Sequence, residues 1–158
     1  MIADILTLFR SSGGETDSRT QLSTEDERLA LAALLVRAAR SDGDYDIREK
    51  SIIDRILRER FAMPDVDSVR VRREAEVLEA KAPDTVRFTR AVKRNVAHEN
   101  REAIVEALWR VVLADDRRDA EEDGFLRLVV HLLGVSDRDS GFARRRAQKA
   151  LFGRNGVA

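Results

Sequence analysis

Apolar residues recur every three or four positions along most of the chain, a spacing that places them on one face of an α-helix. The clearest stripe comprises Leu31, Leu34, Leu35, Ala38 and Ala39, and a later one comprises Ile104, Ala107, Leu108, Val111 and Val112. The strict alternation of apolar and polar positions that marks a strand is absent throughout. We therefore expect an all-α protein, a helical bundle of about seven to eight helices.

Caps, glycines and prolines indicate where the helices begin and end. Pro64 stops one helix because a proline pushes the preceding residue out of the α region, whereas Pro83 fits the first turn of another. The predicted helices span residues 1–9, 23–41, 46–63, 67–80, 83–96, 100–114, 119–133 and 136–151. We expect a short N-terminal helix and flexible linker at 1–23, one helical domain at 24–152 and a disordered tail at 153–158.

The second half of the chain matches the first when the sequence is shifted by 73 positions. The two stripes superimpose, and Ile52, Ile53, Ile56 and Leu57 fall on Phe125, Leu126, Val129 and Val130. Any two pairs of amphipathic helices could match in this way, so the carboxylates between the helices carry more weight. Their pairs are Asp42 and Asp115, Asp46 and Asp119, and Glu49 and Glu122. We infer an internal two-fold pseudo-repeat.

The recurring carboxylates have the spacing Asp-x-x-x-Asp-x-x-Glu in a turn between two amphipathic helices. Carboxylates and turn carbonyls supply the oxygen ligands that calcium and magnesium require. Clustered carboxylates also repel one another by about 1 kcal/mol per pair in water, so a positive group should lie close by. A divalent cation is one candidate, and the flanking arginines are the other. They are Arg40, Arg48, Arg117 and Arg118.

Helix capping explains part of the same motif without a metal. In both turns, the second aspartate and the glutamate have the spacing of a capping box, which stabilises a helix by about 1 kcal/mol. Capping does not explain why the first aspartate, Asp42 or Asp115, recurs four residues earlier. A standard calcium loop is excluded, because its sixth and twelfth positions would be Ile47 and Ile53 instead of glycine and glutamate.

The turns and the helices around them resemble a known family. The segments Ala38–Glu49, Leu108–Asp115 and Leu126–Val135 are similar to the two acidic turns of TerB-like domains and the helices beside them. The resemblance covers roughly Thr24 to Arg146. It implies an all-helical domain with internal pseudo-symmetry, found in bacterial proteins associated with tellurite resistance, with a related domain in a membrane-anchored co-chaperone.

The acidic positions of TerB-like domains are suspected of binding a metal ion. The resemblance carries this role to Asp42, Asp46, Glu49, Asp115, Asp119 and Glu122. The second turn departs from the family, because Asp116 stands where the family tends to have glycine and Arg117 follows it. The added positive charge disfavours a cation there. The first turn is therefore the better candidate for a divalent cation such as calcium or magnesium.

Composition narrows the classes of function. The 158 residues include 29 basic and 29 acidic ones, so no net field attracts nucleic acid, and we expect no nucleic-acid partner. The absence of cysteine excludes disulfides, thiol nucleophiles and iron–sulfur ligation. No run of eighteen uncharged apolar residues occurs, and the first residues lack the features of a secretory signal. We therefore expect no transmembrane segment and a cytoplasmic location.

The remaining candidate residues favour structural roles. His98 and His131 are the only histidines, and their separation does not fit a metal-binding pair. No nucleophile elbow or phosphate-binding loop is present, so we do not expect an enzyme. The basic runs at 70–73 and 144–146 are assigned to solvated helix faces, and Trp109 to the core or to a contact between helices.

Two main hypotheses about function follow, besides nucleic-acid binding through Arg144 to Arg146, which the balanced charge disfavours. The first is a non-enzymatic binding module in bacterial stress physiology, whose acidic turns bind a divalent cation or dock a protein partner. The second is a purely structural protein–protein interaction domain, whose acidic turns only cap helices. Apolar residues on one side of the first predicted helix could also pack against a second copy in a homodimer. They are Ile2, Ile5, Leu6 and Phe9.

Overall fold

The computed structural model describes residues 24–41, 43, 45–82, 84–114 and 124–152. Every regular element in these ranges is an α-helix, which confirms the predicted class. In chain order the helices are α2 (Thr24–Arg40), α3 (Ile47–Phe61), α4 (Asp65–Lys81), α5 (Thr85–Asn95), α6 (His98–Ala114), α7 (Gly124–Leu132) and α8 (Asp137–Phe152). The helix and linker predicted for 1–23 and the tail predicted for 153–158 lie outside the described residues.

The helix ends lie within two residues of their predicted positions wherever the structure describes them. Helix α4 shows the reason for one difference, because it begins at Asp65 instead of the predicted residue 67. Pro64 is extended, with φ −63° and ψ 157°, and serves as the N-terminal cap of α4. The proline that ends one helical stretch therefore also begins the next. The predicted start of α7, at residue 119, lies outside the described residues.

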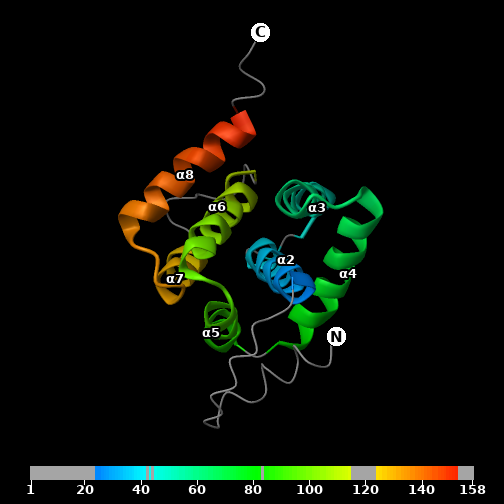
Figure 1. The fold of residues 1–158 in the computed structure, drawn as a ribbon, viewed down its shortest axis with the longest axis horizontal. Helices are drawn as coiled ribbons and strands as arrows, with labels where there is room; N and C mark the ends of the chain where they lie inside the picture. Colours follow the sequence, from blue (N-terminus) through cyan, green and yellow to red (C-terminus); the bar gives the residue numbers. More distant parts are fainter. Residues whose placement is uncertain (1–23, 42, 44, 83, 115–123, 153–158) are drawn as a thin grey trace.

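Helix α2 lies in the middle of the fold, with α3 and α4 on one side and α6 on the other (Figure 1). Helix α8 packs along α6, and α5 packs against α7. The sequence of α2 suits this central place, because the eight consecutive residues from Leu29 to Val36 are all buried. A helix that is apolar on all sides is surrounded by protein. No helix in the described ranges combines the length and apolarity that crossing a bilayer requires.

The two apolar stripes form the centre of the hydrophobic core. All of their residues are buried, and so is Ile53, which the sequence had assigned to the core. Phe88 of α5 is fully buried as well, although its sequence context did not indicate this. The guanidinium of Arg37 lies 4.9 Å from the centroid of the Phe88 ring. The core therefore extends from α2 to α5, and a charged side chain covers its edge.

Extended to the helices of the structure, the predicted repeat pairs α2, α3 and α4 of the first half with α6, α7 and α8 of the second. Helices α3 and α7 each end in a left-handed residue, Ala62 (φ 50°) and Gly134 (φ 73°), 72 positions apart. A buried residue follows each of them directly, Met63 and Val135. The offset of 73 that aligns the earlier helices thus becomes 72 at the third. These spacings support the internal repeat, which stays a prediction.

Candidate functional site

The first acidic turn joins α2 to α3 and is built from caps at both helix ends. Gly43, with φ +88°, donates its N–H to the carbonyl of Arg40 at 3.0 Å. The carboxylate of Asp46 accepts the N–H of Glu49 at 3.1 Å, and the carboxylate of Glu49 accepts the N–H of Asp46 at 3.2 Å. Both halves of a capping box are therefore present, as the spacing predicted.

The two carboxylates of the capping box differ in exposure. Asp46 is exposed, whereas Glu49 is only 3% exposed and lies under the turn. Ile47, between them, is 79% exposed. Asp42 and Asp44 of the same turn lie outside the described residues. Asp46 is therefore the described carboxylate that meets solvent.

The described residues include two of the six candidate metal ligands that the sequence suggested, Asp46 and Glu49. A calcium ion takes six to eight oxygen ligands, and Asp46 with Glu49 supply two carboxylates that already hold backbone N–H groups. Nowhere among the residues that the structure describes do three or more acidic or histidine side chains gather as a metal site. The other candidate ligands fall outside these residues. They are Asp42, Asp115, Asp119 and Glu122.

Tyr45 links the acidic turn to α4. Its hydroxyl donates to a carboxylate oxygen of Glu76 at 2.9 Å. The Arg40 guanidinium and the Lys50 ammonium each lie 5.0 Å from the centroid of its ring. Burial, followed by the hydrogen bond to a negatively charged carboxylate, raises the pKa of Tyr45 well above its ordinary value of 10. The tyrosine is therefore neutral and held by α2, α3 and α4 together.

Arg72 of α4 continues this contact to the middle of α3. Its Nε lies 2.7 Å from a carboxylate oxygen of Asp54, and another guanidinium nitrogen lies 2.5 Å from the Glu76 carboxylate. Burial by itself would lower the pKa of Arg72, but its hydrogen bonds to Asp54 and Glu76 outweigh burial and raise it. Burial by itself would raise the pKa of Glu76, but its hydrogen bonds from Tyr45 and Arg72 lower it. Arg72 and Glu76 therefore both stay charged and hydrogen-bonded to each other.

The solvated face predicted for residues 70–73 is wrong for Arg72, which is 9% exposed. It is right for Arg70 and Arg73, which are exposed. The signal that could have located Arg72 is the helical register of α4, since it shares the buried face with Ser68, Val71, Ala75 and Leu78. A buried arginine needs paired carboxylates. Here the partners come from α3 and from the next turn of α4.

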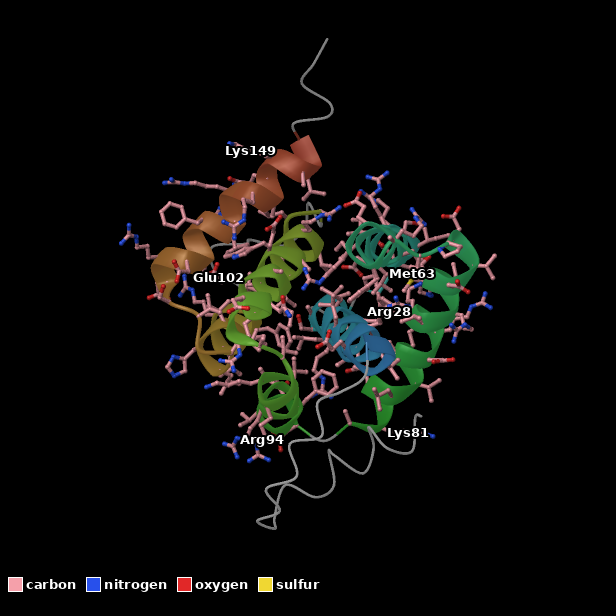
Figure 2. The ribbon with its side chains drawn as sticks, in the orientation of Figure 1. Arg28, Met63, Lys81, Arg94, Glu102 and Lys149 are labelled. Atoms are coloured by element: carbon pink, nitrogen blue, oxygen red, sulfur yellow. The ribbon has the colours of Figure 1, made fainter. Side chains whose placement is uncertain are left out.

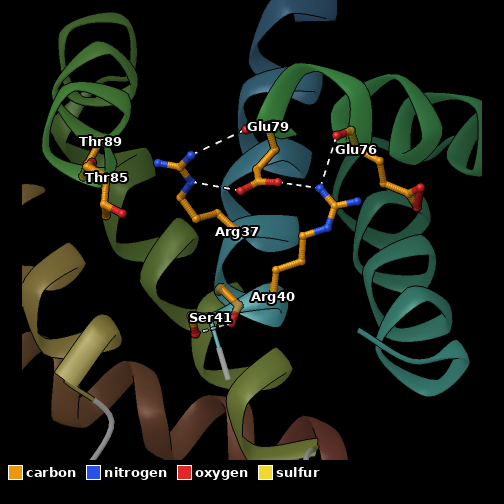
Figure 3. Close-up of polar contacts among 8 residues, drawn as sticks. Arg37, Arg40, Ser41, Glu76, Glu79, Thr85 and Thr89 are labelled. Carbon is orange, nitrogen blue, oxygen red and sulfur yellow. Dashed lines mark hydrogen bonds and ion pairs between the residues drawn. The ribbon is translucent and has the colours of Figure 1, made fainter. Parts of the chain in front are cut away.

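A second ion cluster clamps the end of α2 to α4. The carboxylate of Glu79 accepts from Arg37 at 3.1 Å and from Arg40 at 2.5 Å, and Arg40 also donates to the carbonyl of Glu76 at 3.3 Å (Figure 3). Both arginines lie in the last turn of α2, where the helix dipole favours positive charge. Arg40, immediately before the acidic turn, thus contacts both the carboxylate of Glu79 and the ring of Tyr45.

A shallow groove of about 380 Å³ runs between α3 and α4 beside the acidic turn. Its lining residues are Ile47, Lys50, Ser51, Asp54, Arg72, Arg73 and Glu76. The paired groups Asp54, Arg72 and Glu76 form its polar floor, and Ile47 stands at the end where the turn begins.

We name Arg40, Tyr45, Asp54, Arg72 and Glu76 the turn network.

Trp109 joins two helices of the second half. Its indole Nε1–H donates to the hydroxyl of Ser140 at 3.1 Å, which links α6 to α8. The guanidinium of Arg144 lies 5.2 Å from the centroid of the indole. This confirms the contact between helices that the sequence predicted for Trp109.

His131 is exposed on α7 and does not belong to either acidic turn.

Comparison with known families identifies the domain. The model of the family described as Tellurite resistance protein TerB matches residues 28–145, a span that runs from α2 into α8 and covers most of the chain. No curated protein matches the chain significantly, and no solved structure does. The matched span contains the capped acidic turn, the turn network and the Trp109 contact. The chain belongs to the TerB family of tellurite resistance proteins.

Proposed function

We propose that the chain is a non-enzymatic binding module that serves tellurite resistance or the wider bacterial stress response in the cytoplasm. Its binding surface is the first acidic turn, where Asp42, Asp46 and Glu49 offer oxygens to a divalent cation or to a docking protein. Membership of the TerB family supports the link to tellurite resistance. The absence of cysteine fits a reducing compartment such as the cytoplasm.

The observation that carries this proposal is the anchoring of the turn at Tyr45. Capping needs only the aspartate and the glutamate of the capping box, yet Tyr45 is also held by Glu76 and covered by Arg40 and Lys50. A surface that is already ordered loses less conformational entropy when it binds. The anchoring therefore favours a presented binding surface over a turn that merely joins two helices.

The second acidic turn is the weaker half of the proposed surface. Its candidate residues are Asp115, Asp119 and Glu122. Arg117 and Arg118 stand inside this turn and add positive charge where a cation would bind. Arg118 also occupies the position that corresponds to Tyr45, so the tyrosine anchor has no aromatic counterpart there. We therefore propose the first turn as the principal site.

A non-enzymatic role fits the chemistry of the described residues. The groups whose pKa values depart from their ordinary range are Tyr45, Arg72 and Glu76. They contact one another, and Arg72 also pairs with Asp54, so that the acidic turn and α3 are both joined to α4. Perturbed pKa values arise in structural ion-pair networks as well as in active sites. The network is thus better suited to positioning the turn than to proton transfer.

The alternative is a purely structural interaction domain in which the acidic turns only cap helices. The complete capping box at Asp46 and Glu49 favours it, because both carboxylates then have a sufficient reason to be there. In this case the binding surface would lie elsewhere on the molecule. The two proposals differ in what Asp42 does, since Asp46 and Glu49 complete the capping box of α3 without it.

The deciding experiment measures thermal unfolding of chelator-treated protein with calcium, magnesium, manganese or zinc added in turn. A bound ion at 100 times its dissociation constant should stabilise the protein by about 2.7 kcal/mol, a rise of several degrees. Asp42→Asn should abolish the rise while leaving the capping box intact. Asp137→Asn is the matched control, because it removes one exposed carboxylate from the first turn of another helix.

Each outcome separates the proposals. A rise with one ion that Asp42→Asn loses and Asp137→Asn keeps supports the acidic turn as a cation site. No rise with any ion removes the cation and leaves partner docking, which the same Asp42→Asn variant tests by pull-down of partners that the parent protein retains. If Asp42→Asn changes neither ion binding nor the retained partners, the purely structural alternative holds.

A further inference from the structure

The outward face of α8 carries a narrow stripe of basic residues around one aromatic ring. Its members are Arg138, Phe142, Arg145 and Lys149, and all four are exposed. Their spacing of four, three and four residues keeps them within an arc of about 60° and a length of about 16 Å on the helix. The opposite face of α8 is buried, through Ser140, Ala143 and Ala147. We name the four exposed residues the α8 stripe.

Phe142 is the apolar centre of the α8 stripe. It is 42% exposed, and it is the one aromatic side chain among the large exposed apolar residues of the described chain. The guanidinium groups of Arg138 and Arg145 lie 5.7 Å and 5.8 Å from the centroid of its ring. A guanidinium that lies over a ring keeps the N–H groups in its own plane available for a carboxylate. Two arginines thus lie close to one exposed apolar ring.

The positive charges of the α8 stripe are not balanced within the described part of the protein. Among those residues, neither Arg138, Arg145 nor Lys149 forms an ion pair. Arg146, on the flank of the same helix, pairs with Glu106 of α6 at 2.9 Å. The stripe therefore presents a complementary surface to negative charge from outside.

We propose that the α8 stripe docks an acidic amphipathic helix of a partner protein. Arg138 and Arg145 lie about 10 Å apart along the axis of α8, the distance between residues seven apart on a second helix packed alongside. Two carboxylates of the partner bind these arginines, and an apolar side chain between them covers Phe142. Lys149 meets a third carboxylate one turn further along.

The shape of the stripe favours a helix over a membrane or nucleic acid. Asp137 and Asp139 flank it near its N-terminal end, one on each side. A bilayer surface or a duplex presents negative charge over a broad area and would approach these aspartates too. A helix contacts only the narrow stripe.

The test measures fluorescence anisotropy of a labelled synthetic helix with glutamates seven residues apart and leucine between them. The controls are a scrambled peptide of equal charge, phosphatidylglycerol vesicles and a duplex DNA. Arg138→Gln with Arg145→Gln should weaken binding of the helix roughly tenfold, and Phe142→Ala roughly thirtyfold if its contact is an anchor of the interface. Arg90→Gln with Arg94→Gln, which removes the same charge from the exposed face of α5, should leave it unchanged (Figure 2 labels Lys149 on α8 and Arg94 on α5).

The proposal is supported if the ordered helix binds more tightly than its scrambled form and only the α8 variants weaken it. It is overturned if the parent protein does not bind the helix, or binds the scrambled peptide equally well. It is overturned as well if vesicles or DNA bind more tightly than the helix with the same dependence on Arg138 and Arg145. The stripe would then bind negatively charged surfaces in general. Thermal midpoints of the variants should match the parent, since the replaced side chains are exposed.

Discussion

The two halves of the protein attach their third helix by different chemistry. In the first half, Arg72 of α4 joins the carboxylates of Asp54 and Glu76, so that α3 and α4 are held by charge. In the second half, the arginine 72 positions later is Arg144, which covers the ring of Trp109. The counterparts of the two carboxylates are an arginine and a glutamine, Arg127 and Gln148. The matching arginine is therefore in a buried ion pair in the first half and over an aromatic ring in the second, where the ion pair between Arg146 and Glu106 is more exposed.

This difference indicates that buried charges such as Asp54 and Arg72 are not required for packing the third helix of a half. Removing ions from water is costly, and a buried ion pair is often no more stabilising than apolar residues of the same shape. The second half packs α8 on α6 with Trp109, Ser140 and a buried alanine face, and its ion pair between Arg146 and Glu106 lies nearer to solvent. The charged arrangement stands next to the acidic turn, and Tyr45 connects the two. We therefore regard the turn network as a device that fixes the turn.

The largest expected effect comes from breaking the buried pair of the first half. Asp54→Ala leaves the guanidinium of Arg72 with Glu76 alone, in a site where the side chains of Asp54 and Arg72 are only 11% and 10% exposed. Removing one partner of a buried pair costs about 3 to 5 kcal/mol, and we expect the lower end because Glu76 remains. Urea unfolding followed by circular dichroism measures the loss.

The matched control for this prediction is Arg127→Ala, the counterpart of Asp54 in the second half. Arg127 is exposed on α7, so its truncation should change the free energy of unfolding by no more than about 0.5 kcal/mol. Equal losses in the two variants would show that the halves do not differ in the way the contacts indicate.

Sequence predicted the scaffold better than the site, for a physical reason. The stripe that contains Leu34 and the one that contains Leu108 follow from local periodicity, and the cap at Asp46 follows from local spacing, so both were predicted correctly. The pair of Arg72 with Asp54 spans 18 residues and depends on how α3 and α4 are packed. Periodicity does not carry that information. Trp109 was assigned to a contact between helices, but its partner Ser140 required the structure.

The two aromatic hydrogen bonds sharpen the comparison at a smaller scale. Tyr45→Phe removes a donor to a charged carboxylate, whereas Trp109→Phe removes a donor to the neutral hydroxyl of Ser140. Hydrogen bonds to charged groups are worth about 1.5 to 3 kcal/mol and neutral ones about 0.5 to 1.5. Tyr45→Phe should therefore destabilise the protein more. Thermal unfolding of both variants tests this, and Trp109→Phe also loses some indole packing, which works against the expected order.

The titration of Tyr45 provides an independent check on its anchoring. It is the single tyrosine of the chain, so tyrosinate absorbance reports this residue alone. Burial and the contact with Glu76 raise its pKa above 10, so its contribution to stability is complete below pH 10 and is lost as the pH rises toward the folded-state value. Absorbance that rises near pH 10 in the folded protein would contradict the contact. Glu76→Gln should move the ionisation back toward pH 10.

The carboxylate of Glu76 predicts a dependence on acid. Its pKa lies below the ordinary value of 4.5 in the folded protein, so its pairing stabilises the fold above that pH. The stabilisation is lost as the pH falls through the folded-state pKa. Glu76→Gln should cost about 1 to 2 kcal/mol at pH 7 and flatten the fall in stability below about pH 4.5. Gln148→Ala, at the corresponding position of α8, should leave the loss of stability below about pH 4.5 unchanged. If the parent and Glu76→Gln lost stability equally as the pH fell below 4.5, the pairing would be contradicted.

The smallest effects test the repeat itself at the residues that end α3 and α7. Ala62 is left-handed, with φ 50°, a conformation that strains any residue with a Cβ, whereas Gly134 with φ 73° adopts it without strain. Ala62→Gly should therefore stabilise the protein by a few tenths of a kcal/mol, after the greater entropy of glycine in the unfolded chain is subtracted. Gly134→Ala should destabilise it by about 1 kcal/mol, since a Cβ there would also come within 3.4 Å of the flexible end of Lys93. Opposite signs in calorimetric midpoints would establish that the two positions play one role in both halves. If Ala62→Gly destabilised the protein as much as Gly134→Ala, the left-handed geometry would not be the feature that the halves share.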